Sequence, residues 1–171
     1  VKSGLDVIRA DHFSPLKGKR VALVTNKSAV AGDGSHLLDL LLSEKIEVVK
    51  IFTPEHGFSV DKDSNVGDSS IADIPLISLY GKKRKLDPAA LADVDIVIYD
   101  ILGVGARYYT YTATMVYTMR ACKSAGVSMI VLDRPNPSGG LIISGFIPEE
   151  KLTGHFTSIY PIPIRHGMTP G

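Results

Sequence analysis

The sequence contains no tryptophan and only one cysteine, Cys122, among its 171 residues. A single cysteine cannot form an internal disulfide, which excludes a disulfide-stabilised scaffold. Net charge is also nearly absent, at +1 from 19 basic and 18 acidic residues. We therefore expect neither a nucleic-acid partner nor attraction to an anionic membrane. Because no apolar run approaches the length of a membrane span, we expect no membrane insertion either.

What the sequence does contain is a regular alternation of short apolar runs and helical patterns. Apolar runs predict strands, and apolar residues at helical spacing predict helices, in the order strand 20–25, helix 33–45, strand 46–53, strand 74–80, helix 88–93, strand 94–100, helix 110–126 and strand 127–133. Strands that are apolar throughout and alternate with helices indicate an α/β fold, with a mostly parallel sheet covered on both faces. The length fits a single domain over residues 1–171.

Three finer expectations concern the ends and connections of these elements. Asp33 or Ser35 is a plausible N-cap for the helix at 33–45. The polar stretch 58–73 is long for a connection and predicts a functional loop. A last strand is expected near residues 158–164, within a final part rich in proline and glycine.

Polar and ionisable side chains follow the carboxyl ends of the predicted strands. In an open parallel sheet, ligands bind beyond these ends. The candidate site residues, in chain order, are Asn26, Glu55, His56, Asp100, Arg107, Tyr109, Tyr111, Asp133, Arg134, Asn136, Arg165 and His166. Each has a structural alternative: an aspartate can cap a loop or helix, an arginine can pair with it, and a tyrosine can simply pack.

The stretch Gly-Val-Gly-Ala-Arg-Tyr at 103–108 resembles a dinucleotide-binding fingerprint, but the match is poor. It follows the fourth predicted strand rather than the first, and Tyr108 occupies the third glycine position. No acidic residue follows at the spacing that holds a ribose. The sequence also lacks a P-loop and a zinc-type cluster, so we expect no nucleotide cofactor and no metal.

Six stretches, taken in order, resemble one known family. They are LVTNKSAV, FTPEHGF, SLYGKKRK, YDILGVGARYYTY, LDRPNPSGG and YPIPIRHGMT, and together they resemble the exo-β-N-acetylmuramidases, bacterial glycosidases formerly catalogued as a domain of unknown function. The resemblance implies a Rossmann-like N-terminal domain and a second, C-terminal domain, with the active site between them. It also implies removal of N-acetylmuramic acid from the non-reducing end of peptidoglycan fragments, without a cofactor.

The resemblance has consequences for the extent of this chain. The sequence stops at Gly171, just after the last motif, so the C-terminal domain of the family is expected to be absent. A first domain without its partner domain is expected to self-associate through the uncovered surface or to be less stable than the intact protein. A substrate derived from peptidoglycan implies a periplasmic or secreted protein.

Glycoside hydrolysis needs an acid for the leaving oxygen and a second group at the anomeric carbon. Glu55 is the first candidate for the acid, because a carboxyl group packed between Pro54 and Phe58 would be partly desolvated and would hold a proton near neutrality. His56 would orient Glu55 or contact a sugar hydroxyl. The second group is Asp100, Asp133 or the acetamido group of the substrate.

The remaining candidates are assigned to substrate binding. The lactyl carboxylate of N-acetylmuramic acid calls for an arginine, which is Arg107, Arg134 or Arg165, with Arg107 the first choice. Tyr109 or Tyr111 would stack on the sugar ring or stabilise the transition state. Asn26, Asn136 and His166 complete the set.

At three places the sequence departs from the pattern of the family. Ser59-Val60 stands where members usually have Arg-Gly, Leu102-Gly103 where they have Gln-Asp, and Ser144-Gly145-Phe146 where they have Glu-Gly-Pro. Two carboxylates and one arginine are thereby lost. An alternative function follows: a module that binds cell-wall sugars and has lost part of the charged site.

Overall fold

The computed structural model describes residues 1–59, 69–81 and 84–171. In this part of the chain six strands form one sheet in the order β3-β4-β2-β1-β5-β6, and every neighbouring pair except β3–β4 is parallel. The strands are β1 (Arg20–Thr25), β2 (Glu47–Thr53), β3 (Ser69–Ile71), β4 (Ile74–Ser78), β5 (Ile96–Asp100) and β6 (Ser128–Val131). From β1 the chain first builds one side of the sheet, with β2, β4 and β3, and then the other side, with β5 and β6. The direction in which strands are added therefore reverses between β1 and β5.

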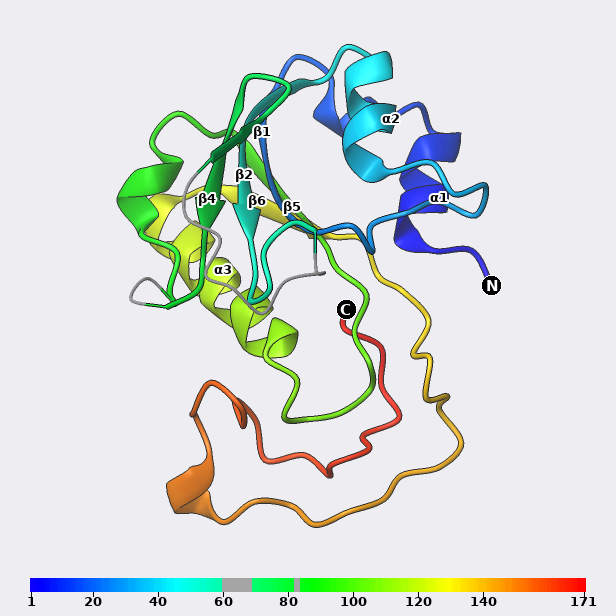
Figure 1. Cartoon of the computed structure of the whole chain (residues 1–171), viewed down its shortest axis with the longest axis vertical. Helices are drawn as coiled ribbons and strands as arrows, with labels where there is room; N and C mark the ends of the chain where they lie inside the picture. Colours follow the sequence, from blue (N-terminus) through cyan, green and yellow to red (C-terminus); the bar gives the residue numbers. More distant parts are fainter. Residues whose placement is uncertain (60–68, 82–83) are drawn as a thin grey trace.

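Helices cover both faces of the sheet, as the strand pattern predicts (Figure 1). One face carries α1 (Gly4–Ala10) and α2 (Leu37–Ser43), and the other carries α3 (Tyr111–Ala125) and a short 3-10 helix at Pro88–Leu91. Two further 3-10 helices occupy Ser14–Leu16 and Glu150–Leu152. The protein is therefore a three-layer, Rossmann-like α/β domain.

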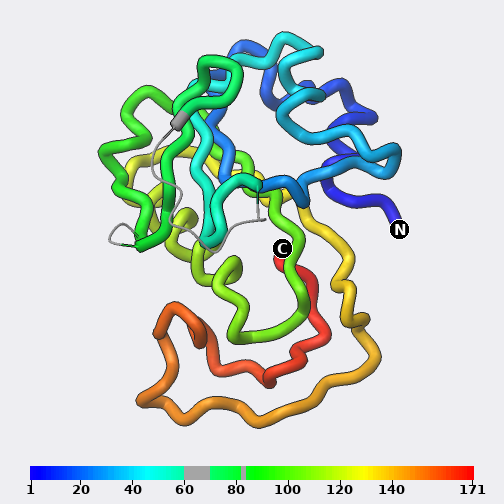
Figure 2. The backbone as a smooth tube through the Cα atoms, viewed as in Figure 1, coloured from blue at the N-terminus to red at the C-terminus, as the bar shows by residue number. Residues whose placement is uncertain are grey.

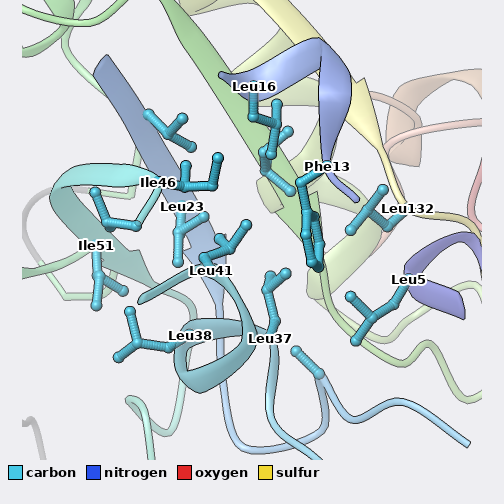
Figure 3. Close-up of a cluster of buried hydrophobic side chains, with 14 of the residues drawn as sticks. Leu5, Phe13, Leu16, Leu23, Leu37, Leu38, Leu41, Ile46, Ile51 and Leu132 are labelled. Carbon is cyan, nitrogen blue, oxygen red and sulfur yellow. The ribbon is translucent and has the colours of Figure 1, made fainter. Parts of the chain in front are cut away.

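Strand β1 is buried on both sides, because its alternate side chains enter two different cores. Val21 and Leu23 pack with α1 and α2, whereas Ala22 and Val24 pack with α3. Figure 3 shows the first of these cores, where leucines of α2 meet Phe13 and the sheet. This division explains why the strand is apolar at nearly every position.

The eight elements predicted between residues 20 and 133 agree with the structure, most of them with shorter ends. One helix start was wrong: α2 begins at Leu37, and its N-cap is His36, whose Nδ1 accepts from the Leu38 N–H at 3.1 Å. Asp33 is used elsewhere, since it binds Arg9 at 2.7 Å and the Ser35 N–H at 3.0 Å. Asp33 and Ser35 thus belong to the turn before the helix.

Three further differences concern elements that the sequence pattern did not reveal or placed wrongly. The prediction missed α1, although Ser3 and Asp6 form a capping box there. It also missed β3, which forms a hairpin with β4 through Ala72 and Asp73, both at positive φ. In the predicted loop 58–73, residues 69–71 therefore form a strand and residues 72–73 a hairpin turn. Residues 60–68 lie outside the described residues.

The strand expected near residues 158–164 is wrong. In the described chain this region forms only isolated bridges, between His155 and Ser158 and from Arg165 to Ala106 and Ser144. We call residues 133–171 the C-terminal loop. It leaves β6, passes away from the sheet and returns to it (Figure 2), and Asp133 joins its two ends by accepting from the Gly171 N–H at 2.8 Å.

The core predicts different outcomes for two neighbouring leucines of α2. Leu41 has no exposed surface, whereas Leu42 is 39% exposed. We expect Leu41→Ala to lower the free energy of unfolding by about 2–5 kcal/mol, because it leaves a cavity between helix and sheet. Leu42→Ala changes the same residue type at the surface and should cost less than about 1 kcal/mol. Urea unfolding of both variants checks this, and equal losses would contradict the assigned packing.

Candidate functional site

The candidate site lies at the carboxyl edge of the sheet, where the chain order reverses between β1 and β5. The two strands end side by side, since Thr25 pairs with Asp100 and its hydroxyl donates to the Asp100 carbonyl at 2.9 Å. Such a reversal opens a crevice above the sheet in doubly wound folds. The polar side chains predicted from the strand ends therefore do share one edge.

A cavity of about 350 Å³ opens beyond β5, between the β5–α3 connection and the last residues of the chain. This volume is near the lower limit of small-molecule sites, roughly 300–1,000 Å³. Its walls are largely apolar and aromatic, with Ile101 and Met115 at one side and Tyr160 and Met168 at the other. Of the predicted site residues, those that line it are Tyr109, Tyr111, Asn136 and His166.

Glu55 lies in a tight turn after β2, at residues 54–58, which we call the Glu55 turn. The Gly57 N–H donates to the Pro54 carbonyl at 3.0 Å, and His56 adopts φ of 69°, a left-handed conformation that is uncommon outside glycine. Holding His56 in this region has an energetic cost, and such costs cluster at functional sites. The turn directs the half-buried Glu55 side chain toward the start of α3.

One hydroxyl group binds the Glu55 carboxylate: Thr110 Oγ1 donates to Glu55 Oε2 at 2.6 Å. Interaction with the same carboxylate raises the pKa of the Tyr80 hydroxyl. The three residues come from the ends of β2 and β4 and the start of α3. Donation to one carboxylate oxygen leaves the other free to carry a proton, so this arrangement suits both the ionised and the protonated acid.

Asn26 organises the backbone around the Glu55 turn. It is buried, and its Nδ2 donates to the Tyr111 hydroxyl at 3.3 Å, which in turn donates to the Glu55 carbonyl at 3.4 Å. Its Oδ1 accepts from the Ser28 hydroxyl at 2.6 Å, and that hydroxyl accepts from the Leu102 N–H at 2.9 Å. The network joins the ends of β1, β2 and β5 to α3. Asn26 thus has a structural role: it connects the elements that position the Glu55 turn.

Asp100 and Arg134, predicted for catalysis and for substrate binding, bind each other. Arg134 Nε and Nη2 reach the two Asp100 oxygens at 2.5 and 2.8 Å, and Nη1 donates to the Val30 carbonyl at 2.9 Å. Asp100 has no exposed surface. Burial raises its pKa, and the Arg134 guanidinium opposes that rise. Within the described chain, this geometry places neither side chain where a sugar could bind it.

Asp133 and Asn136 hold the C-terminal loop in place. Asp133 accepts from the Arg134 N–H at 2.9 Å, the Thr169 hydroxyl at 2.6 Å and the Gly171 N–H. Asn136 Nδ2 donates to the Met168 carbonyl at 2.9 Å and so closes the cavity wall. Both side chains thus shape the cavity, and Asn136 also faces it.

Gly105 is required opposite Asn136. Its φ is +76°, and a Cβ added there would lie 2.2 Å from Asn136 Oδ1. The same oxygen accepts from the Ser138 N–H at 2.8 Å, and the Ser138 hydroxyl donates to the Val104 carbonyl at 2.8 Å. The glycines of the 103–108 stretch therefore serve close packing of two loops.

Arg107 and Arg165 also make contacts within the C-terminal loop. Arg107 Nη1 donates to the carbonyls of Phe146 and Ile162, both at 2.8 Å, and Arg165 Nη2 donates to the Ser138 carbonyl. Each keeps a buried Nε that has no hydrogen-bond partner among the described residues. These two arginines retain unused donors, unlike Arg134.

The aromatic and imidazole candidates face the cavity in different ways. Tyr109 and Tyr111 pack edge to face, with ring centroids 4.7 Å apart, but Tyr111 is only 4% exposed. Tyr109 is half-buried and offers more surface to a ligand. Burial lowers the pKa of His166, whose Nδ1 accepts from the Met168 N–H at 3.1 Å. His166 is therefore a neutral hydrogen-bonding group near pH 7.

Sequence reasoning missed Thr110, Tyr80 and Ser28. Thr110 and Tyr80 lie inside two of the quoted motifs, YDILGVGARYYTY and SLYGKKRK, and Ser28 lies in LVTNKSAV. Their position in motifs was the available signal, but hydroxyl groups are common and reveal no partner in a sequence. No group of three His, Cys, Asp or Glu side chains suited to a metal occurs in the described ranges. In those ranges, too, every helix is too short or too polar to cross a membrane.

The fold and the site define a Rossmann-like α/β domain with a polar sheet edge beside an apolar cavity. The family model for the N-terminal part of exo-beta-N-acetylmuramidase NamZ matches residues 21–171. Peptidoglycan beta-N-acetylmuramidase NamZ of Bacillus subtilis (strain 168) is 43% identical to it, over 100% of this chain and 42% of that protein. The chain therefore belongs to the NamZ N-terminal family.

Solved structures agree with this assignment. Two DUF1343 family proteins from Bacteroides fragilis NCTC 9343 match with TM-scores of 0.88 and 0.81, at 39% and 40% identity. Each alignment covers 99% of this chain, but only 43% and 44% of the two solved chains. The chain thus spans less than half the length of these relatives.

The buried ion pair gives a stability prediction. We expect Asp100→Asn to lower the free energy of unfolding by about 3–5 kcal/mol, because Arg134 is left as an uncompensated buried charge. The control is Glu149→Gln, which breaks an exposed pair with Lys151 at 2.8 Å and should cost at most about 1 kcal/mol. Chemical denaturation measures both, and a small loss for Asp100→Asn would show that Arg134 finds another partner.

Proposed function

We propose that this chain is the N-terminal domain of a longer exo-β-N-acetylmuramidase, acting on saccharides derived from peptidoglycan. The family membership and the activity in the name of the Bacillus subtilis relative support the proposal. The observation in the structure that carries it is the half-buried Glu55 carboxylate, held by the Thr110 hydroxyl. Glu55 does not line the cavity, but Tyr109 and Tyr111, on either side of Thr110, do. The C-terminal part of the relatives would complete the cleft.

Glu55 is the proposed general acid. In the reaction the glycosidic C–O bond breaks, and the Glu55 proton moves to the leaving oxygen. Its surroundings support this role, since the Glu55 side chain is half-buried and the Thr110 hydroxyl orients the carboxyl group. His56, which follows in the strained turn, is the proposed contact to a sugar hydroxyl or to Glu55.

Two routes remain for the group at the anomeric carbon. Asp133 is half-buried but already accepts three hydrogen bonds, and Asp100 has no exposed surface. The acetamido group of the substrate needs no second protein carboxylate: its oxygen bonds to the anomeric carbon as the leaving group departs, and water then opens the ring it forms. The scarcity of available carboxylates among the described residues favours the substrate-assisted route.

The cavity is the proposed binding site for one muramic acid unit. Tyr109 offers an aromatic surface to the sugar, while Asn136 and His166 offer polar groups at the walls. Arg107 or Arg165 is the proposed partner of the lactyl carboxylate, although neither lines the cavity and the Nε of each is buried. No cofactor is part of the proposal. Because the substrate occurs in the cell wall, we infer a periplasmic or secreted location.

The test uses the full-length protein and measures release of N-acetylmuramic acid from a chromogenic muramide. We expect Glu55→Gln to lower kcat by about 10²–10⁴-fold, because the general acid is lost. Glu149→Gln removes an exposed carboxylate that does not line the cavity and is the matched control. Full activity of Glu55→Gln would refute the role.

The alternative function gives a different outcome in the same protein. Calorimetry that finds saturable binding of muramic acid without turnover would favour a sugar-binding module. The departures at Gly103 and Ser144 support this second function, since Gly103 lines the cavity and Ser144 pairs with Arg165. Absence of both binding and turnover would reject both functions.

We also infer that the isolated chain self-associates through its C-terminal loop. Five of the seven residues from 141 to 147 are large and apolar, and each is at least 55% exposed. Leu141→Glu combined with Ile147→Glu should shift the chain toward monomer in sedimentation velocity experiments. Val7→Glu, at a residue 58% exposed on α1, is the control. A chain that is monomeric at all concentrations would contradict the inference.

A further inference from the structure

Thr110 occupies the N-cap position of α3 but does not cap the helix. Its side chain makes no capping hydrogen bond, and its backbone is already helical, at φ −69° and ψ −14°. Threonine at an N-cap ordinarily accepts from an N–H of the first turn. The N-cap side chains of α1, α2 and the 3-10 helix at Pro88 all do so, through Ser3, His36 and Asp87.

The Thr110 hydroxyl is used for a different bond. It donates to Glu55 Oε2 at 2.6 Å, across 55 positions of sequence. The longest helix of the described chain thus begins without a side-chain cap, and the hydroxyl that would supply one binds the acid instead. The helical backbone of Thr110 lies outside the β region that a capping residue ordinarily adopts, so its hydroxyl is available to Glu55.

We infer that Thr110 is a positioning residue that determines which oxygen of Glu55 carries the proton. The inference rests on the proposed role of Glu55. While the Thr110 hydroxyl donates to Oε2, as it does in the structure, Oε2 is an acceptor and only Oε1 can carry a proton. The acidic proton is thereby directed to Oε1, and rotation of the carboxyl group is restricted. Thr110 need not touch the substrate to have this effect.

The position of α3 strengthens the contact. The Thr110 carbonyl accepts from the Thr114 N–H at 3.0 Å, so Thr110 is fixed by the helix itself. Tyr111, the next residue, is buried and its hydroxyl donates to the Glu55 carbonyl. Two consecutive residues therefore hold the side chain and the backbone of Glu55 to the same helical turn. A helix is a more rigid support for an acid than a loop.

The experiment compares Thr110→Val, which removes the hydroxyl, with Thr110→Ser, which keeps it. In the full-length protein we expect Thr110→Val to lower kcat by about 10- to 100-fold with little change in KM, since the acid is misplaced and substrate contacts are not. Thr110→Ser should stay close to wild type. The pH profile of kcat should change in Thr110→Val and not in Thr110→Ser.

A capping role predicts a different pattern. If Thr110 served only the helix, Thr110→Val would lower the melting temperature, and any lost activity would follow the lost fold. We expect no such decrease. Thr118→Val is the control within α3, because the Thr118 hydroxyl bonds only to the Thr114 carbonyl at 2.8 Å in the described chain. It should leave kcat unchanged.

The outcomes separate this inference from the proposed function. If Glu55→Gln abolishes activity but Thr110→Val retains full kcat, the positioning role is refuted and the proposed function stands. If the wild-type protein has no muramidase activity, the proposed function fails. In that case a crystal structure of Thr110→Val still decides the positioning role: an unmoved Glu55 carboxyl group overturns it.

Discussion

The arrangement of the site depends on the buried ion pair between Asp100 and Arg134. Asp100 is the last residue of β5, Arg134 follows β6, and Arg134 also binds the Val30 carbonyl after β1. One guanidinium thus joins three segments at the carboxyl edge of the sheet. Two charges removed from water are tolerated only together, because either one alone is strongly destabilising in an interior. The pair therefore specifies how the strand ends meet, whatever its net contribution to stability.

From this pair, contacts extend in two directions. Asp133, next to Arg134, holds the end of the C-terminal loop and so positions the cavity wall. On the other side, Asn26 connects β1 to Tyr111, whose ring lines the cavity and whose hydroxyl reaches the Glu55 turn. Tyr111 is thus shared by the cavity and by the turn. A ligand in the cavity would lie beside the residues that orient Glu55.

Much of the fold followed from the sequence, because parallel strands buried on both faces are apolar at nearly every position. The location of the candidate residues also followed, since the carboxyl ends of such strands share one edge. The contacts between these side chains could not be predicted from the sequence. Asp100 and Arg134 are 34 positions apart, and their pairing depends on β5 and β6 being neighbours in a particular register. The prediction of the N-cap of α2 was wrong for a related reason, because Asp33 binds Arg9, which is distant in the sequence.

Of the departures from the family pattern, Gly103 lines the cavity, whereas Ser59 directly follows the Glu55 turn. Leu102 contributes its backbone N–H to Ser28, a contact that any residue except proline can make. Gly103 lies against Pro170, at 3.3 Å from a Cβ built there, so a larger side chain would press on the C-terminal loop.

The sequence keeps the residue that orients Glu55, since the Thr110 hydroxyl binds its carboxylate and Thr110 is not a departed position. A changed wall with an unchanged acid alters which sugar fits before it alters how the bond is broken. Within the proposed function, the departure at Gly103 is therefore better explained as a change of substrate than as a loss of chemistry.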